Sequence, residues 1–154
     1  MKIKDLDTPA LLIDQDVLMK NIRRMQDYVA EKHIDLRPHV KTHKMPYIAS
    51  LQKQAGAVGI AVAKTEEAEI MAQNGMDRIL IANEVVGEEK LKRIARLSNT
   101  CQILYGVDSV YQIRQSEKVF GEFGKTALVV VEIEVGEERS GVIEDELFVE
   151  IISE

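Results

Sequence analysis

Apolar and polar positions along the chain switch repeatedly between a helical and a strand-like period. Leu18, Ile22, Met25 and Val29 recur at intervals of four, three and four residues, which predicts a helix with one apolar stripe. Short apolar runs follow, and an amphipathic stretch separates each run from the next. This pattern predicts strands at 34–41, 57–63, 78–82, 101–105 and 127–135, and helices at 14–30, 46–55, 65–74, 88–97, 109–118 and 145–153.

The strict alternation of strands and helices indicates the fold class. It implies parallel strands joined by right-handed crossovers. Two α/β architectures fit: an open doubly wound sheet, or a (β/α)8 TIM barrel truncated to about five βα units. A complete barrel needs roughly 250 residues, whereas this chain has 154.

Composition narrows the possible partners and the compartment. The chain carries 20 Lys and Arg against 26 Asp and Glu, a net charge of −6, so neither nucleic acid nor an anionic membrane is an expected partner. Its one cysteine, Cys101, excludes an internal disulfide and is expected to be a small buried hydrophobe. Asp5 and Asp7 interrupt the start of the chain, where a signal peptide needs an apolar run. A cytoplasmic globular protein is expected.

A basic stripe on the first predicted strand is the most informative feature. If the segment stays extended, Arg37, His39, Lys41 and His43 point to one side. An unpaired buried ammonium would lose its proton or destabilise the fold by several kcal/mol. The stripe therefore needs carboxylates, an anionic ligand, or covalent use of a lysine.

Three interpretations of this stripe remain open from the residues alone. The strand could lie at an edge of the sheet, with the stripe in water. His39 and His43 could bind a metal at HxxxH spacing, although that spacing suits a helix and Pro38 opposes one here. The third is an anion or cofactor pocket in which Lys41 or Lys44 is reactive, since parallel sheets bind ligands at the carboxyl ends of their strands.

The last predicted strand offers a counterpart of opposite charge. Glu132 and Glu134 would share one face by alternation and could offset the basic stripe across a sheet interior. The glycine-flanked Arg139 would then lie over the same end of the sheet as Lys41.

Two further acidic segments carry weaker signals. The run Thr65-Glu66-Glu67-Ala68-Glu69 is expected to be the acidic first turn of a helix rather than a catalytic pair. Asn83 and Glu84 follow the third strand and either reach the same face or form an ordinary turn.

Several segments resemble, in order along the chain, the D-threonine aldolase and D-serine dehydratase family. These are pyridoxal-phosphate enzymes of the alanine-racemase fold type, and the similarity covers their N-terminal part. The matching segments are DLDTPALLID (5–14), RPHVKTHK (37–44), GAVGIAVAKTEEAE (56–69), ILIANEVVG (79–87) and VEIEVGEERSGV (131–142).

The resemblance implies roles for three residues. The lysine of the RPHxKTHK motif forms the Schiff base with pyridoxal 5'-phosphate in the family, which implies the catalytic and cofactor-binding role for Lys41. The arginine of the VGxxRxGV segment corresponds to Arg139 and implies a contact near the pyridine nitrogen, which would stay unprotonated. His39 is expected to line the cofactor ring.

The resemblance also implies that residues 1–154 form a partial domain. Members of the family carry an eight-stranded barrel followed by a C-terminal β domain. Their phosphate loops come from late barrel strands and the ligands of a divalent metal from the C-terminal domain. Both regions are absent from this sequence, so we expect an incomplete alanine-racemase-like barrel without the metal site.

The function implied is a pyridoxal-phosphate-dependent lyase acting on small D-β-hydroxy amino acids, aldolase-like or dehydratase-like. An amino-acid racemase of the same fold type, a non-catalytic pyridoxal-phosphate-binding protein and an inactive remnant are the alternatives. Unpaired strand edges in a partial barrel also predict a homo-oligomer or self-association.

Overall fold

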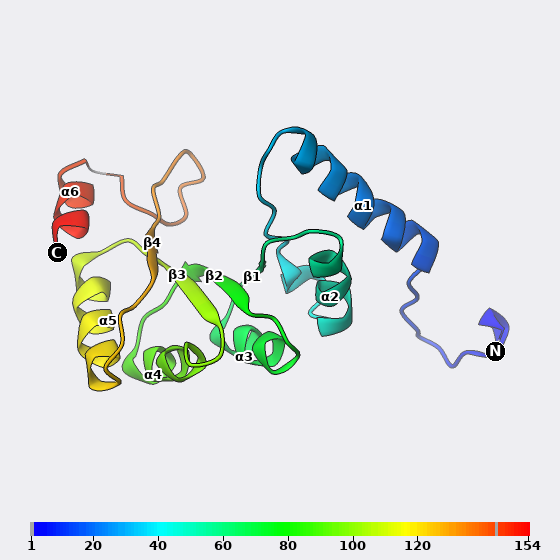
Figure 1. The fold of residues 1–154 in the computed structure, drawn as a ribbon, viewed down its shortest axis with the longest axis horizontal. Coiled ribbons are helices and arrows are strands. Elements are labelled where there is room, and N and C mark those ends of the chain that lie inside the picture. Colours follow the sequence, from blue (N-terminus) through cyan, green and yellow to red (C-terminus); the bar gives the residue numbers. More distant parts are fainter. Residues whose placement is uncertain (1, 144) are drawn as a thin grey trace.

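The computed structural model describes residues 2–143 and 145–154 (Figure 1). The helices in this part of the chain are α1 (Gln15–Glu31), α2 (Pro46–Gln54), α3 (Thr65–Gln73), α4 (Glu88–Leu97), α5 (Val110–Glu122) and α6 (Asp145–Ser153), together with the short 3-10 helices η1 (Ile3–Asp5) and η2 (Val40–Thr42). The strands are β1 (Ile60–Val62), β2 (Arg78–Glu84), β3 (Gln102–Val107) and β4 (Val129–Val131).

The four strands form one parallel sheet in the order β1-β2-β3-β4. Figure 1 shows α3, α4 and α5 following one another along one side of this sheet, in the order of the chain. A doubly wound sheet reverses its strand order at a switch point, and the four described strands do not. The architecture is therefore that of part of a (β/α)8 barrel, and the open-sheet alternative is wrong.

The two faces of the sheet differ in burial. Ile79 and Ile81 of β2 point to the helix side and are buried in the core, while Ala82 is exposed. On β4 and just before it, Val130 and Leu128 are each 43% exposed. One face is thus packed under helices, whereas the other face, which would line a barrel, leaves Ala82 and Val130 exposed.

The segment 34–41 was expected to be a strand, and that expectation is wrong. Only His39 pairs with β1, as a single bridge to Ala61, and the chain enters η2 at Val40. The Ala61 N–H donates to the carbonyl of Pro38 at 2.8 Å, but a proline has no N–H to return a ladder bond. The segment lies beside β1 as an irregular edge.

The long strand expected at 127–135 is also wrong in its extent, because pairing with β3 stops at Val131. Beyond that residue the chain bonds to its own returning loop: the Val142 N–H donates to the Glu132 carbonyl at 2.9 Å, and the Glu134 N–H donates to the Val142 carbonyl at 3.0 Å. The Glu132 N–H still donates to the Val107 carbonyl of β3 at 2.9 Å, but the Glu132 carbonyl and the Glu134 N–H are used within the loop.

Candidate functional site

Lys41 lies in the middle of η2, where the chain turns away from the sheet. His39 caps this turn, since its Nδ1 accepts the backbone N–H of Lys41 at 3.2 Å. Val40 is fully buried and packs into the core with Ile60 and Val62, while the next residue, Lys41, is exposed. The turn therefore anchors one side chain inside and presents the lysine outside.

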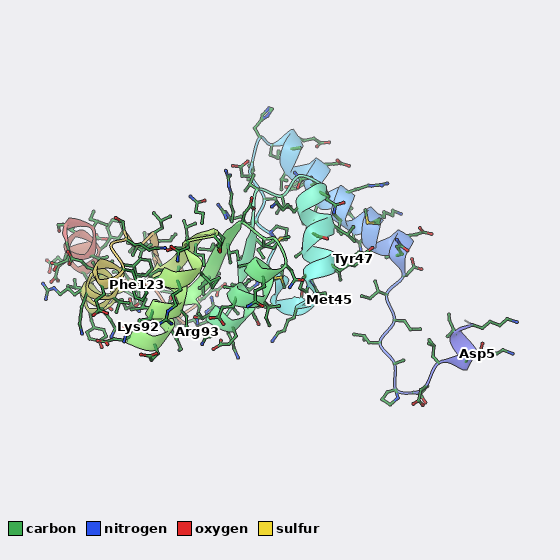
Figure 2. All side chains as sticks on the ribbon, turned by 60° about the horizontal axis from the view of Figure 1, so that its bottom comes forward. Asp5, Met45, Tyr47, Lys92, Arg93 and Phe123 are labelled. Atoms are coloured by element: carbon green, nitrogen blue, oxygen red, sulfur yellow. The ribbon has the colours of Figure 1, made fainter. Side chains whose placement is uncertain are left out.

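The turn breaks the expected basic stripe. The Arg37 guanidinium packs over Gly59, where a Cβ atom would come within 2.5 Å of Nη1. His43 lies beyond η2, and its Nδ1 accepts the N–H of Met45 at 3.0 Å, at the start of α2 (Figure 2). The expectation that Arg37, His39, Lys41 and His43 share one face is wrong, because strand alternation ends at His39.

Burial lowers the pKa of both His39 and His43. Burial, followed by the charge of Lys41, lowers the pKa of His39, and the charge of Glu67 opposes this shift. For His43, the neighbouring Gln52 side chain opposes the lowering of the pKa. Within 2–143 and 145–154, no group of three or more His, Cys, Asp or Glu side chains is arranged to hold a metal ion.

The two candidate lysines differ in their partners. Lys44 Nζ forms an ion pair with Glu67 Oε1 at 3.1 Å. In the part of the chain that the structure describes, no carboxylate forms such a pair with Lys41. Both lysines are exposed, but only Lys44 is held by a carboxylate.

Glu67 is a residue whose importance the sequence analysis missed. Its side chain lies between η2 and the end of β1, and its Oε2 accepts the Ala63 N–H at 2.9 Å. Burial raises the pKa of Glu67, but hydrogen bonds from Ala63 and Lys44 outweigh this and hold it below its ordinary value. Glu67 lies four residues before the buried Met71, so both residues lie on the inner side of α3. This spacing is the signal by which the sequence could have identified Glu67.

Arg139 lies on a glycine-flanked loop organised by Glu134. The Glu134 carboxylate accepts the backbone N–H groups of Gly136, of Glu137 at 2.5 Å and of Arg139 at 3.1 Å. These bonds, led by the one from Arg139, lower the pKa of Glu134 to about 2. The Arg139 side chain is exposed, and its Nη2 lies 3.5 Å from Glu137 Oε2.

Glu132 and Glu134 do not offset the basic stripe, so that expectation is wrong as well. Glu132 accepts the Ser140 hydroxyl at 2.7 Å and lies beside Glu84. Burial and then the hydrogen bond with Glu132 raise the pKa of Glu84, while that bond lowers the pKa of Glu132. Glu84, the last residue of β2, and Glu132, directly after β4, thus place two neighbouring carboxyl groups at one end of the sheet.

The candidate residues occupy one end of the sheet but opposite edges. Because all strands are parallel, Lys41 and Arg139 both follow carboxyl ends, as expected. His39 and Lys41 are in contact, whereas four strand spacings of about 4.8 Å separate their edge from β4, roughly 19 Å along the sheet. The structure therefore brings His39 and Lys41 together and leaves Arg139 across the open face.

A one-sided parallel sheet with an exposed lysine after its first edge is the arrangement of a barrel-type domain. Residues 13–154 match the family described as "Alanine racemase, N-terminal domain", and the chain belongs to this family. The resemblance inferred from the motifs is thereby confirmed.

Two relatives and one solved structure show in more detail which proteins this chain resembles. The chain is 37% identical to the D-threonine aldolase of Arthrobacter sp. over 142 residues, 92% of this chain and 38% of that protein. It is 38% identical to the D-threo-3-hydroxyaspartate dehydratase of Delftia sp. (strain HT23), over 92% of this chain and 37% of that protein. The crystal structure of D-threonine aldolase from Filomicrobium marinum superposes with a TM-score of 0.95 at 40% identity, covering 98% of this chain and 41% of that one. The chain thus spans about two fifths of the length of these proteins.

The helices give no indication of membrane insertion. Among the residues that the structure describes, no helix is both long and apolar enough to cross a bilayer.

Proposed function

We propose that this chain is the lysine-bearing part of a pyridoxal-phosphate-dependent lyase that acts on D-β-hydroxy amino acids, with aldol cleavage as the first candidate reaction. The observation that carries the proposal is the presentation of Lys41: an exposed amine without a carboxylate partner, on a turn anchored in the core. The names of the relatives, an aldolase and a dehydratase of D-amino acids, support the choice of substrate.

The donor groups at this end of the sheet fit pyridoxal 5'-phosphate, an anionic aromatic aldehyde. A lysine amine reacts with a carbonyl group, and the planar imidazole of His39 adjoins that lysine. The guanidinium of Arg139 is exposed at the opposite edge and suits an anionic or ring-nitrogen acceptor. When bound, the cofactor supplies an electron-withdrawing ring that stabilises negative charge on the substrate carbon.

The chain's own residues would then have separate tasks. Lys41 Nζ binds the cofactor and, as a free amine, moves a proton at that atom. His39 orients Lys41 by accepting its backbone N–H. Arg139 holds the cofactor ring from the other edge, on a loop that Glu134 fixes.

A cofactor titration followed by absorbance tests the proposal. We expect a spectral change in the wild type, its loss in Lys41→Ala, and its retention in Lys64→Ala, a control at an exposed lysine outside this turn. Saturation should be shallow, because the resemblance assigns the phosphate loops to later strands. A spectral change that survives in Lys41→Ala would overturn the assignment.

The reaction itself is decided by products, measured on this chain and on the protein extended to the full length of its relatives. An aldolase gives glycine and an aldehyde from D-threonine, a dehydratase gives a keto acid and ammonia, and a racemase gives the enantiomer. Cofactor capture at Lys41 without any of these products would make the chain a pyridoxal-phosphate-binding protein.

We also propose that the isolated chain self-associates through its bare sheet face and the free edge of β4. Val130 is half exposed there, on a strand that pairs on one side only, and such edges pair with other chains. Light scattering should show smaller particles for Val130→Lys, whereas Ile34→Lys at the opposite edge should resemble the wild type. A monodisperse wild-type monomer would contradict this.

A further inference from the structure

We propose that Glu67 is a positioning residue, which fixes the turn that presents Lys41 by binding Lys44 and the end of β1 at the same time. The inference deepens the proposed function, since that function gives Lys41 its chemical task.

The Glu67 carboxylate is buried and uses both oxygens. Its side chain belongs to a residue that is only 8% exposed, on the first turns of α3. Oε2 accepts the N–H of Ala63, directly after β1, at 2.9 Å, and Oε1 faces Lys44 Nζ at 3.1 Å. One carboxylate therefore ties the sheet to the residue three positions after Lys41.

Lys44 in turn closes the turn that contains Lys41. Its N–H donates to the carbonyl of Val40 at 2.7 Å. Its backbone has φ of +52°, in the left-handed region, which side chains with a Cβ adopt only at an energetic cost and when their surroundings hold them there. The ion pair with Glu67 stabilises this backbone conformation of Lys44, while the buried Val40 side chain anchors the turn in the core.

A carboxylate suits this position better than an amide. Both groups that Glu67 faces, the Ala63 N–H and the Lys44 ammonium, are donors. A glutamine has one acceptor oxygen and one NH2 group, so one donor would face another donor in a buried setting. Glu67→Gln should therefore release Lys44 or the Ala63 amide at almost unchanged volume.

Glu66 provides the matched control. It is the preceding carboxylate on the same helix turn, but its Oε1 accepts from Arg93 Nη1 of α4 at 2.8 Å. Figure 2 shows Arg93 away from Met45, which follows the Lys41 turn. Glu66→Gln removes the same charge from α3 without touching Lys44.

The first measurement needs no cofactor. In an NMR titration, Glu67→Gln should lower the pKa of His39, because the Glu67 charge favours the imidazolium against the burial and the Lys41 charge that disfavour it. Hydrogen exchange of the Lys44 amide should become about tenfold faster. Glu66→Gln should leave both values at those of the wild type.

The second measurement follows the reactivity of Lys41. With pyridoxal 5'-phosphate and borohydride, the rate of labelling at Lys41 relative to exposed Lys64 should fall in Glu67→Gln and in Lys44→Met. Lys44→Arg keeps the ion pair and should restore the wild-type ratio, a rescue that loss of packing alone would not produce.

These two measurements distinguish a failure of the proposed function from a failure of the role of Glu67. A wild type that is never labelled at Lys41 would refute the proposed function, while the exchange of the Lys44 amide and the His39 titration still decide on Glu67. Labelling at Lys41 that is equal in the wild type, Glu67→Gln and Lys44→Met would overturn the role of Glu67 and leave the function intact. Should Glu67→Gln fail to fold by circular dichroism, Lys44→Met decides, since it alters the more exposed partner of the pair.

Discussion

The two edges of the sheet hold their candidate residues in different ways. At the first edge, Lys41 sits on a turn that the core fixes: Val40 is fully buried beside it, and the buried Glu67 binds the turn from outside. At the far edge, Arg139 sits on a loop that is exposed over residues 135–139 and is held by the carboxylate of its own Glu134.

Lys41 and Arg139 should therefore respond to different perturbations. The position of Lys41 is coupled to the folding of the whole domain, because removing its anchors disturbs the core. The position of Arg139 depends on local backbone bonds, which can be lost while the domain stays folded. Each edge can therefore be altered without the other.

The largest difference between the two edges is expected in the free energy of unfolding, when a valine at each edge is replaced by alanine. Val40→Ala leaves a cavity in the core and should lower the free energy of unfolding by about 2 kcal/mol. Val135→Ala, at a residue that is 87% exposed, should change it by less than about 0.5 kcal/mol. Urea unfolding followed by circular dichroism measures both, and equal midpoints would remove the contrast between the edges.

A glycine pair sharpens the account of the far edge. Gly141 has φ of +99°, and a Cβ there would lie 2.7 Å from the Glu134 nitrogen and 2.8 Å from the Ile133 carbonyl carbon. Gly136 has φ of +117° with open space around it. Gly141→Ala should therefore destabilise the loop by more than about 1 kcal/mol. Gly136→Ala should destabilise it less than Gly141→Ala does. Hydrogen exchange of the Val142 amide reports the difference, and a larger effect at Gly136 would contradict the packing described.

Acid should disorder the loop around Arg139 at the far edge, and this effect should be smaller and confined to the loop. The pKa of Glu134 is lowered to about 2 by backbone N–H groups, so the ordering it provides is complete above its ordinary value of 4.5 and is lost as the pH falls towards 2. The amide NMR signals of Gly136 and Arg139 should move together in that range. The same movement in Glu134→Gln would show that another group titrates.

The sequence predicted the helices and their alternation with parallel strands well, because both follow from periodicity, whereas the order of the strands in the sheet came only from the structure. The helices 88–97 and 145–153 have the observed bounds, and the buried Cys101 is confirmed. Pro38 signalled the absence of a helix, but the change from strand to 3-10 turn depends on the His39 side chain accepting a backbone N–H, which no periodic pattern reveals.

The site was predictable in its residue types more than in its pairing. The motif around Lys41 named the lysine, yet alternation assigned Arg37 and His43 to its face wrongly. Charge balance predicted that Glu132 and Glu134 would face the basic stripe, whereas the loop's own amides and Ser140 bind them. Glu67 escaped notice because an acidic residue in the first turn of a helix is ordinarily solvated.

Mapping the lysine that carries the cofactor tests the central claim most directly. The wild-type chain is incubated with pyridoxal 5'-phosphate, reduced with borohydride, digested and analysed by mass spectrometry. The account predicts that the label lies on the peptide containing Lys41, with Lys44 unmodified. A label on Lys44, or one spread over surface lysines while Lys41 stays free, would contradict it.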